Sequence, residues 1–327
     1  SLPLFLAILS IAAAPFVAAA PAAGQDAPPL ELRRLDGPIE VDGIPDEAAW
    51  ASVPTLPLTQ YAPTFRGTPT QRTEIRVAYD DEYFYAAGWF YDEDPSGIRI
   101  NSLYRDRWNG DDAFAIYIDA FNDDRNAKWF GTTAAGMRFD QLVSDDGATL
   151  NGSWDAFWNS RSTVTEEGWF VEVRIPFSTL GFQPDADGNV VMGLTVQRKI
   201  ARRSERLVFP AVAPDADWAF LKPSRARKVV LEGIHPSRPV YVTPYALGGV
   251  GRRYVERAPD PVQPPGTPAY RPDDDTRREV GLDLKYGLTN DLTLDATLNT
   301  DFAQVEADDQ QVNLTRFNLF FPEKRQF

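Results

Sequence analysis

Residues 74–91 read EIRVAYDDEYFYAAGWFY, and this stretch decides the fold. From Ile75 to Tyr79 apolar residues occupy every second position. From Tyr83 to Tyr91 two sets alternate: Tyr83, Tyr85, Ala87, Trp89 and Tyr91 on one face, and Phe84, Ala86, Gly88 and Phe90 on the other. Successive side chains of a strand point to opposite faces of a sheet, so each run predicts one strand. The run Asp-Asp-Glu between them predicts a turn, and the whole stretch therefore predicts a β-hairpin.

The same rhythm continues along much of the chain. Helical signals are weak, and only Asp46–Ala51 and Ser178–Gly181 are expected to form single turns of helix. Many short strands separated by turns, over about two hundred residues, predict an all-β fold, a β-sandwich of the jelly-roll or immunoglobulin-like kind. Further strands are expected at 112–119, 127–133, 136–143, 168–175, 190–198 and 206–210.

Two later runs, 279–286 and 292–302, also alternate between apolar and polar side chains. Strands of about ten residues suit a membrane-spanning hairpin with lipid on one face and water on the other. A hairpin of a soluble sandwich would show the same pattern. Residues 257–275 are rich in Pro and Asp and are expected to form a long loop, flanked by strands at 238–251 and 277–288.

Composition limits the partners and the chemistry. The 327 residues include no Cys and one His, and the formal net charge is −14. Such an acidic chain argues against a nucleic-acid partner, which needs a basic face. A Cys nucleophile and a His-rich zinc site are excluded, and His235 is expected to be structural or exposed. The sequence marks out no catalytic pair of carboxylates, so the question of enzymatic activity stays open, with the balance against it.

The first residues resemble an export signal. Residues 2–20 are almost wholly apolar and lead into small residues, which predicts a signal peptide over 1–23. Its charged leader is missing, since the sequence opens on Ser1; a membrane-anchor helix is the alternative. The Pro- and Gly-rich residues 24–38 are expected to be a linker. Export without disulfides is common among Gram-negative outer-membrane proteins.

Four segments form an ordered set of motifs: IEVDGIPDEAAW at 39–50, VAYDDEYFY at 77–85, DAFAIYID at 112–119 and GWFVEVRIPF at 168–177. Together they resemble the family 9-type carbohydrate-binding modules. The resemblance implies a sugar-binding sandwich over residues 39–233. It also implies that a sugar is clamped between two Trp rings, and, since members of the family often carry structural calcium, it makes one calcium ion possible here.

Two later segments, DFAQVEAD at 301–308 and FFPEKR at 320–325, resemble a bacterial family of unknown function, DUF5916. In that family such a module precedes a region similar to an outer-membrane barrel, although Gln326 stands where Pro is usual. The resemblance implies that residues 234–327 form the first strands of a truncated outer-membrane β-barrel. The implied location is the outer membrane of a Gram-negative bacterium, with the sandwich in the periplasm or facing the surface.

Aromatic side chains are the first candidates for a ligand site, because the apolar faces of sugars lie flat on indole rings. Four Trp lie in turn-rich, polar stretches and are the candidate sugar-stacking residues: Trp108, Trp129, Trp154 and Trp158. Trp50, Trp89 and Trp169 fall in strand or motif positions and are expected in the core. The alternative that all eight Trp are packing residues stays open.

Charged loops are the second candidates. Calcium takes six to eight oxygen ligands, and the candidate ligands are Asp111, Asp112, Asp123 and Asp124. Solvated turns are the alternative interpretation. A basic cluster at 198–206 could meet lipopolysaccharide phosphates or an acidic sugar, although pairing with the acidic surface is the simpler interpretation.

The sequence thus favours a non-catalytic carbohydrate-binding module of an exported outer-membrane protein. It would serve polysaccharide capture, uptake or catabolism, and barrel strands would contact the lipid. Two alternatives stay open. One is a module of a glycoside hydrolase that cleaves O-glycosyl bonds. The other is a periplasmic plug or interaction domain of the barrel that binds no sugar.

Overall fold

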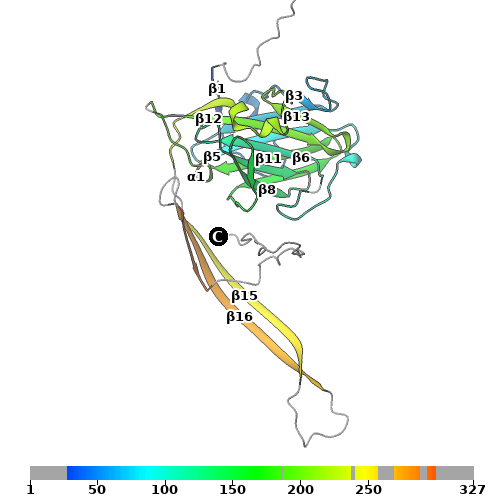
Figure 1. The fold of residues 1–327 in the computed structure, drawn as a ribbon, viewed down its shortest axis with the longest axis vertical. Helices are drawn as coiled ribbons and strands as arrows, with labels where there is room; N and C mark the ends of the chain where they lie inside the picture. The colour runs from blue at the N-terminus through cyan, green and yellow to red at the C-terminus, as the bar shows by residue number, and fades with distance from the viewer. Residues whose placement is uncertain are drawn as a thin grey trace, which may run out of the picture.

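The computed structural model describes residues 28–108, 110–185, 187–236, 240–256, 269–287 and 293–299. Within these ranges the chain forms two sheets packed face to face and a separate three-stranded sheet (Figure 1). The all-β sandwich predicted from the alternation is confirmed. No described helix is both long and apolar enough to cross a membrane. The predicted signal peptide lies outside the described residues.

The larger sheet has nine strands. Its order is β1-β14-β12-β6-β7-β8-β9, with β13 beside β12 and β3 beside β13. All of its predicted strands are confirmed; the sequence missed the short β1, β3 and β9 and also the six-residue β14. The strands are β1 (Leu30–Glu31), β3 (Thr59–Ala62), β6 (Ala113–Asp119), β7 (Ala127–Thr133), β8 (Arg138–Ser144), β9 (Thr149–Asn151), β12 (Asn189–Ile200), β13 (Glu205–Phe209) and β14 (Arg227–Glu232).

The smaller sheet has five strands in the order β10-β11-β5-β4-β2. The predicted hairpin is confirmed as β4 and β5, with Ile75 opposite Gly88. Both predicted helical turns are present, as η1 and α1. The strands are β2 (Arg33–Arg34), β4 (Thr73–Tyr79), β5 (Tyr83–Tyr91), β10 (Asn159–Thr165) and β11 (Gly168–Pro176); the helical turns are η1 (Ala48–Ser52), η2 (Pro95–Gly97), α1 (Phe177–Leu180), η3 (Ala201–Arg203), η4 (Ala219–Leu221) and η5 (Pro223–Arg225).

The predicted linker at 24–38 is wrong for its described part. Strand β1 pairs in parallel with β14, and β2 pairs in parallel with β4, so this segment adds an edge to each sheet. Leu32, between the two strands, is buried in the core. Strands of two residues are too short to show a period, which is why the sequence pattern missed them. The sandwich therefore begins near Leu30 and its last core residue is Ile234.

The main core lies between the two sheets, and one buried cation joins them. Arg198 points inward from β12 and is fully buried. Its guanidinium donates hydrogen bonds to the carbonyl oxygens of Arg72 and Tyr91, each at 3.1 Å, on the side of the small sheet. It also lies 4.9 Å from the centre of the Phe90 ring. These contacts hold β12 of the large sheet against the small sheet.

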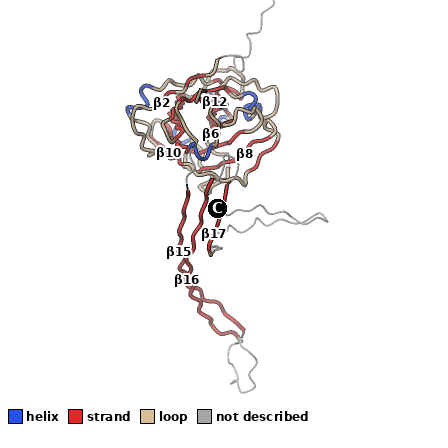
Figure 2. Tube along the Cα trace, turned by 90° about the vertical axis from the view of Figure 1, so that its left-hand side faces the viewer, coloured by secondary structure: helices blue, strands red, loops and turns tan. Residues whose placement is uncertain are grey.

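The third sheet is an antiparallel one made of β15 (Val240–Glu256), β16 (Tyr270–Gly287) and β17 (Thr293–Leu298) (Figure 2). The predicted alternation is confirmed where the chain is described, since β16 and β17 pair with Leu282 opposite Leu298.

Residues 270–275, which were predicted to belong to a loop, instead form the start of β16. Ion pairs across the strands, Arg252 with Asp274 and Arg253 with Asp273, neutralise the acidic run there.

A buried carboxylate fixes the loop before η1 onto the small sheet. Glu172 of β11 accepts hydrogen bonds from the backbone N–H groups of Asp42 and Gly43, both at 3.1 Å, and from the Trp50 indole at 3.3 Å. Gly43 has φ +94°, and a Cβ there would meet the backbone of Arg161 at 3.0 Å. Glycine is therefore required at this position.

Burial, and to a smaller extent the nearby Glu47 carboxylate, raise the pKa of Glu172 to about 7. The folded chain then holds this proton more tightly than the unfolded chain does. Its contribution to the free energy of unfolding should fall as the pH rises from the ordinary pKa towards about 7. Urea unfolding at several pH values across this range should show that the free energy of unfolding falls less steeply with pH in Glu172→Gln than in the wild type. The exposed Glu166→Gln should keep the wild-type slope, and equal slopes in all three proteins would contradict the assignment.

Candidate functional site

A second apolar cluster covers the outer face of the large sheet. On β6, Ile116 and Ile118 face the main core, whereas Ala115 and Tyr117 face outward, as the two-residue period requires. We call the outward-facing group the outer-face cluster. It consists of Ala115, Tyr117, Ala127, Trp129, Met137, Phe139, Val143, Val208, Phe220 and Leu221, with Tyr61 and Trp108 packed against it.

The rings of this face form a continuous band that ends at an exposed Trp. Ring centres are 6.3 Å apart for Trp108 and Trp129, and 5.1 Å apart for Trp129 and Tyr117. The band continues from Tyr117 to Phe220 at 6.2 Å and from Phe220 to Trp218 at 5.7 Å. Trp218 is 56% exposed. One end of the band therefore offers a free aromatic face.

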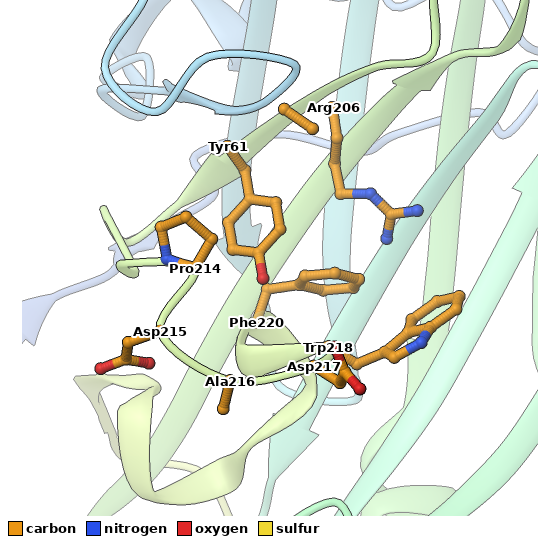
Figure 3. A pocket seen from close by; sticks show the side chains of 9 residues that line it. Tyr61, Arg206, Pro214, Asp215, Ala216, Asp217, Trp218 and Phe220 are labelled. Atoms are coloured by element: carbon orange, nitrogen blue, oxygen red, sulfur yellow. The ribbon is translucent and has the colours of Figure 1, made fainter.

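A pocket of about 460 Å³ lies at this end (Figure 3). Its size is in the range that holds a small ligand. The segment before η4 folds over the sheet and meets side chains that rise from β3 and β13. In Figure 3 the Arg206 side chain reaches towards Phe220 and Trp218, while Asp215 lies at the opposite edge. The lining residues are Tyr61, Ala62, Arg206, Pro214, Asp215, Ala216, Asp217, Trp218 and Phe220.

Arg206 is held in place between rings and an amide. Its guanidinium carbon lies 4.2 Å from the centre of the Phe220 ring and 5.3 Å from that of Trp218. Nη1 donates a hydrogen bond to Oε1 of Gln197 at 2.8 Å, and Nε2 of Gln197 donates to the Tyr117 hydroxyl at 2.6 Å. Burial lowers the pKa of Arg206, although a guanidinium stays charged at neutral pH. Among the described residues Gln197 is its only acceptor, so other N–H groups remain for a ligand.

Two carboxylates line the pocket. Asp215 forms an ion pair with Arg225 at 2.5 Å, and the hydrogen bond from Arg225 lowers the pKa of Asp215. Asp217 is exposed, and no described cation lies within ion-pair distance of it. The pocket thus combines aromatic faces with a guanidinium and a carboxylate. Such a set can stack on an apolar ring and form hydrogen bonds with hydroxyl groups.

The structure separates the four Trp that the sequence singled out. Trp158 belongs to the main core with 3% exposure, and its indole N–H donates to Asp140 at 3.1 Å. Trp129 is 6% exposed within the outer-face cluster, and its indole N–H has no acceptor in the described part of the chain. Neither ring presents a free face in this arrangement.

The other two candidates are half-buried. Trp154 packs edge-on against Phe130 at 5.9 Å, on the main core. Trp108 packs against Phe139 at 4.6 Å and covers one end of the outer-face cluster. Of the four candidates, Trp108 and Trp129 thus belong to the band leading to the pocket, and Trp108 is the one of these two that is half-buried rather than buried.

Sequence reasoning missed Trp218. It follows the loop APDAD at 213–217, outside the family motifs, and its backbone is left-handed with φ +53°. A Trp placed in a Pro- and Asp-rich segment is the signal that would have found it. The expected core positions are confirmed for Trp50 and Trp169, which are buried, while Trp89 is half-buried against the Trp50 cluster.

The four predicted calcium ligands all have partners in the protein. Asp111 accepts from the backbone N–H groups of Asn101 and Ser102, Asp112 from that of Ala201, Asp123 from those of Arg125 and Asn126, and Asp124 pairs with Lys228. Among the described residues no group of three or more acidic, His or Cys side chains could hold a metal ion. Calcium binding stays a prediction.

The basic cluster at 198–206 divides between the two faces of the sheet. Arg198 points into the core, and Arg202 forms an ion pair with Asp92 at 2.5 Å, as the simpler interpretation expected for a surface cation. Lys199 and Arg206 instead face outward beside the aromatic band. His235 is exposed at the end of the sandwich.

The chain matches two known protein families. A family model described as carbohydrate family 9 binding domain-like matches residues 41–232, and a domain of unknown function, DUF5916, matches residues 267–327. The first match covers more than half of the sequence. The chain therefore belongs to the carbohydrate family 9 binding domain-like family.

Several solved structures are similar to the chain. A candidate carbohydrate-binding protein from Bacteroides uniformis is 13% identical, with a TM-score of 0.50, over 62% of this chain and 98% of its own. At this identity the likeness concerns the fold alone.

A family 9 carbohydrate-binding module from Caldicellulosiruptor kristjanssonii, in complex with cellotriose, is 15% identical over 63% of this chain and 94% of its own, with a TM-score of 0.46. The same module in complex with glucose is 15% identical over 64% of this chain and 97% of its own, with a TM-score of 0.43. No curated protein matches the sequence.

The buried and exposed Trp should differ sharply in their effect on stability. Trp158→Ala removes a core ring and leaves Asp140 without its indole donor, so the free energy of unfolding should fall by about 3–5 kcal/mol. Trp218→Ala should lower it by less than about 1 kcal/mol, because much of that ring is in water. Urea unfolding measures both. Similar losses in the two variants would contradict the assignment of Trp218 to a binding surface.

Proposed function

We propose that the sandwich binds carbohydrate in the pocket beside Trp218. The observation that supports this most is an exposed Trp ring at a pocket that also holds Arg206 and Asp217. The C–H face of a pyranose would stack on the indole, and its hydroxyls would pair with the guanidinium and the carboxylate. Membership of a family of carbohydrate-binding domains supports the same ligand class.

Trp108 forms the second aromatic contact of this proposal. Nζ of Lys199 on β12 lies 5.0 Å from the centre of the Trp108 ring, and Arg206 on β13 lies against Trp218. Lys199 and Arg206 are direct partners across the two strands, so each of the two Trp has one member of this cation pair beside it. A short saccharide chain would lie over both positions and contact both rings.

Glycoside hydrolysis has less support. It needs one carboxyl group with a raised pKa as the acid and a second carboxylate across the scissile bond. Of the two carboxylates in the described pocket, Asp215 is paired with Arg225 and has a lowered pKa. The function proposed is therefore binding, in the service of polysaccharide capture or uptake.

Trp218→Ala should weaken sugar binding at least about tenfold, because Trp is enriched among the contact residues whose truncation costs about 2 kcal/mol or more, and about 1.4 kcal/mol corresponds to tenfold in affinity. Isothermal titration with xylotriose and cellotriose measures this on the whole chain, in an amine-oxide detergent that has no sugar head group. Tyr104→Ala removes an exposed ring outside the pocket and should bind like wild type. Unchanged affinity in Trp218→Ala, or no binding by wild type at millimolar sugar, would contradict the proposal.

We also propose that the three-stranded sheet lies in an outer membrane with one face towards lipid. The register puts apolar side chains on one face, and on the other face several charged or polar ones such as Thr243, Asp283, Lys285 and Asp295. Alternation of this kind is typical of strands that separate lipid from water. The apolar face consists of Val240, Val242, Pro244, Ala246, Val280, Leu282, Leu284, Tyr286, Leu294, Ala296 and Leu298.

The same sheet suggests which side of the membrane the sandwich occupies. Past the apolar face, β15 and β16 continue as a ribbon with charged pairs such as Arg252 with Asp274. At the opposite end, Tyr241 stacks on Phe157 of the sandwich at 4.3 Å. Bacterial barrels have short periplasmic turns and longer outer loops. The connection after β15 is the longer one and that after β16 the shorter, so we propose a periplasmic sandwich.

Cysteine labelling tests this arrangement cleanly, because the chain has no Cys of its own. Val250→Cys, at a position 90% exposed on the distal ribbon, should react in intact cells with a polymer-linked maleimide too large for porins. Ser153→Cys, on the exposed surface of the sandwich, should react only after the outer membrane is opened. The opposite pattern would contradict the proposed orientation.

A further inference from the structure

Arg206, which lines the proposed sugar site, has a second cation beside it. Lys199 on β12 is the direct partner of Arg206 on β13. Side chains alternate between the two faces along β12, so Lys199 faces outward while its neighbour Arg198 lies in the core. Arg206 faces the same way as Lys199, its direct partner. Directly opposed residues have Cβ atoms about 5 Å apart, so two positive charges are close neighbours in a chain whose net charge is −14.

No ion pair joins either cation to a described carboxylate, although Asp111 and Asp112 attract Lys199 electrostatically. The acids that most affect Lys199 are Asp111 and Asp112, which are buried and accept hydrogen bonds from backbone N–H groups. Burial, and then the positive charge of Arg206, lower the pKa of Lys199. Like charges directly opposite each other on a sheet destabilise it. Arg202, three residues along, instead has Asp92 as a partner at 2.5 Å.

Both cations are also held against aromatic rings rather than free in solvent. Lys199 lies over Trp108, and Arg206 lies against Phe220 and Trp218 while its Nη1 bonds to Gln197. An anion would therefore meet donors whose positions are already fixed, which is the arrangement that favours charge-assisted hydrogen bonds.

We propose that the site takes an acidic saccharide, a uronic-acid-containing oligosaccharide whose carboxylate binds between Lys199 and Arg206 while pyranose rings stack on Trp218 and Trp108. This inference rests on the carbohydrate binding proposed above and names its ligand class. A carboxylate offers two oxygens, one for Nζ of Lys199 and one for a guanidinium N–H of Arg206. Asp217 is left to accept hydrogen bonds from hydroxyl groups.

Trigalacturonate and its methyl ester are matched probes, since they share one skeleton and differ in charge. Isothermal titration of the whole chain in amine-oxide detergent at neutral pH should show the acid binding at least about tenfold more tightly than the ester, with the ratio shrinking as salt rises. Lys199→Gln and Arg206→Gln should each lower the affinity for the acid to a value close to the affinity for the ester. Arg203→Gln, an exposed cation on η3, removes the same charge and should keep the wild-type ratio.

The outcomes separate this inference from the function on which it rests. Equal affinity for acid and ester, still dependent on Trp218, would overturn the acidic ligand and leave carbohydrate binding standing. An acid preference that persists in the double variant Lys199→Gln/Arg206→Gln would also overturn it. No binding of either probe, xylotriose or cellotriose would overturn both proposals. Thermal melting followed by circular dichroism shows whether each variant is folded. If Arg206→Gln is unfolded, the affinities of Lys199→Gln decide the test alone.

Discussion

The two-residue period of β12 is the constraint on which the sandwich depends. This strand lies between β14 and β6 and also pairs with β13. Val196 and Arg198 enter the core, where Arg198 bonds to the backbone of the small sheet. Gln197 and Lys199 reach the outer face. A slip of one residue would exchange the two sets, so the register that closes the core also builds the pocket.

Much of the sandwich could be predicted because its central strands are long enough to show a period. The β4–β5 hairpin, β6, β11 and β12 follow from alternation and from the family motifs, as do the core positions of Trp50 and Trp169. Strands β1 and β2 could not be predicted, since two residues carry no period and their edges form only against distant partners. Residues 270–275 resemble a loop in the sequence because they are rich in Asp. Their place in a strand becomes clear only when β15 sets Arg252 and Arg253 opposite Asp274 and Asp273.

The candidate site was harder to predict because it depends on pairing between strands. Turn-rich surroundings suggested exposure for Trp129 and Trp158, yet the fold buries both rings. Trp218 gains its role only when the segment before η4 folds over β3 and β13. The meeting of Lys199 and Arg206 is set by the register of two strands, and no local pattern in the sequence reveals it. The meeting of two cations on the outer face of an acidic chain is thus a property of the folded sheet alone.

The indole N–H signals of the eight Trp give the most direct test of where sugar binds. In a ¹⁵N-edited spectrum, assigned with single Trp→Phe variants, saturating trigalacturonate should shift the Trp218 and Trp108 signals. The buried Trp50 and Trp169 signals should stay in place. Binding that leaves Trp218 and Trp108 unmoved and shifts Trp154 instead would contradict a carbohydrate site on the outer face of the large sheet.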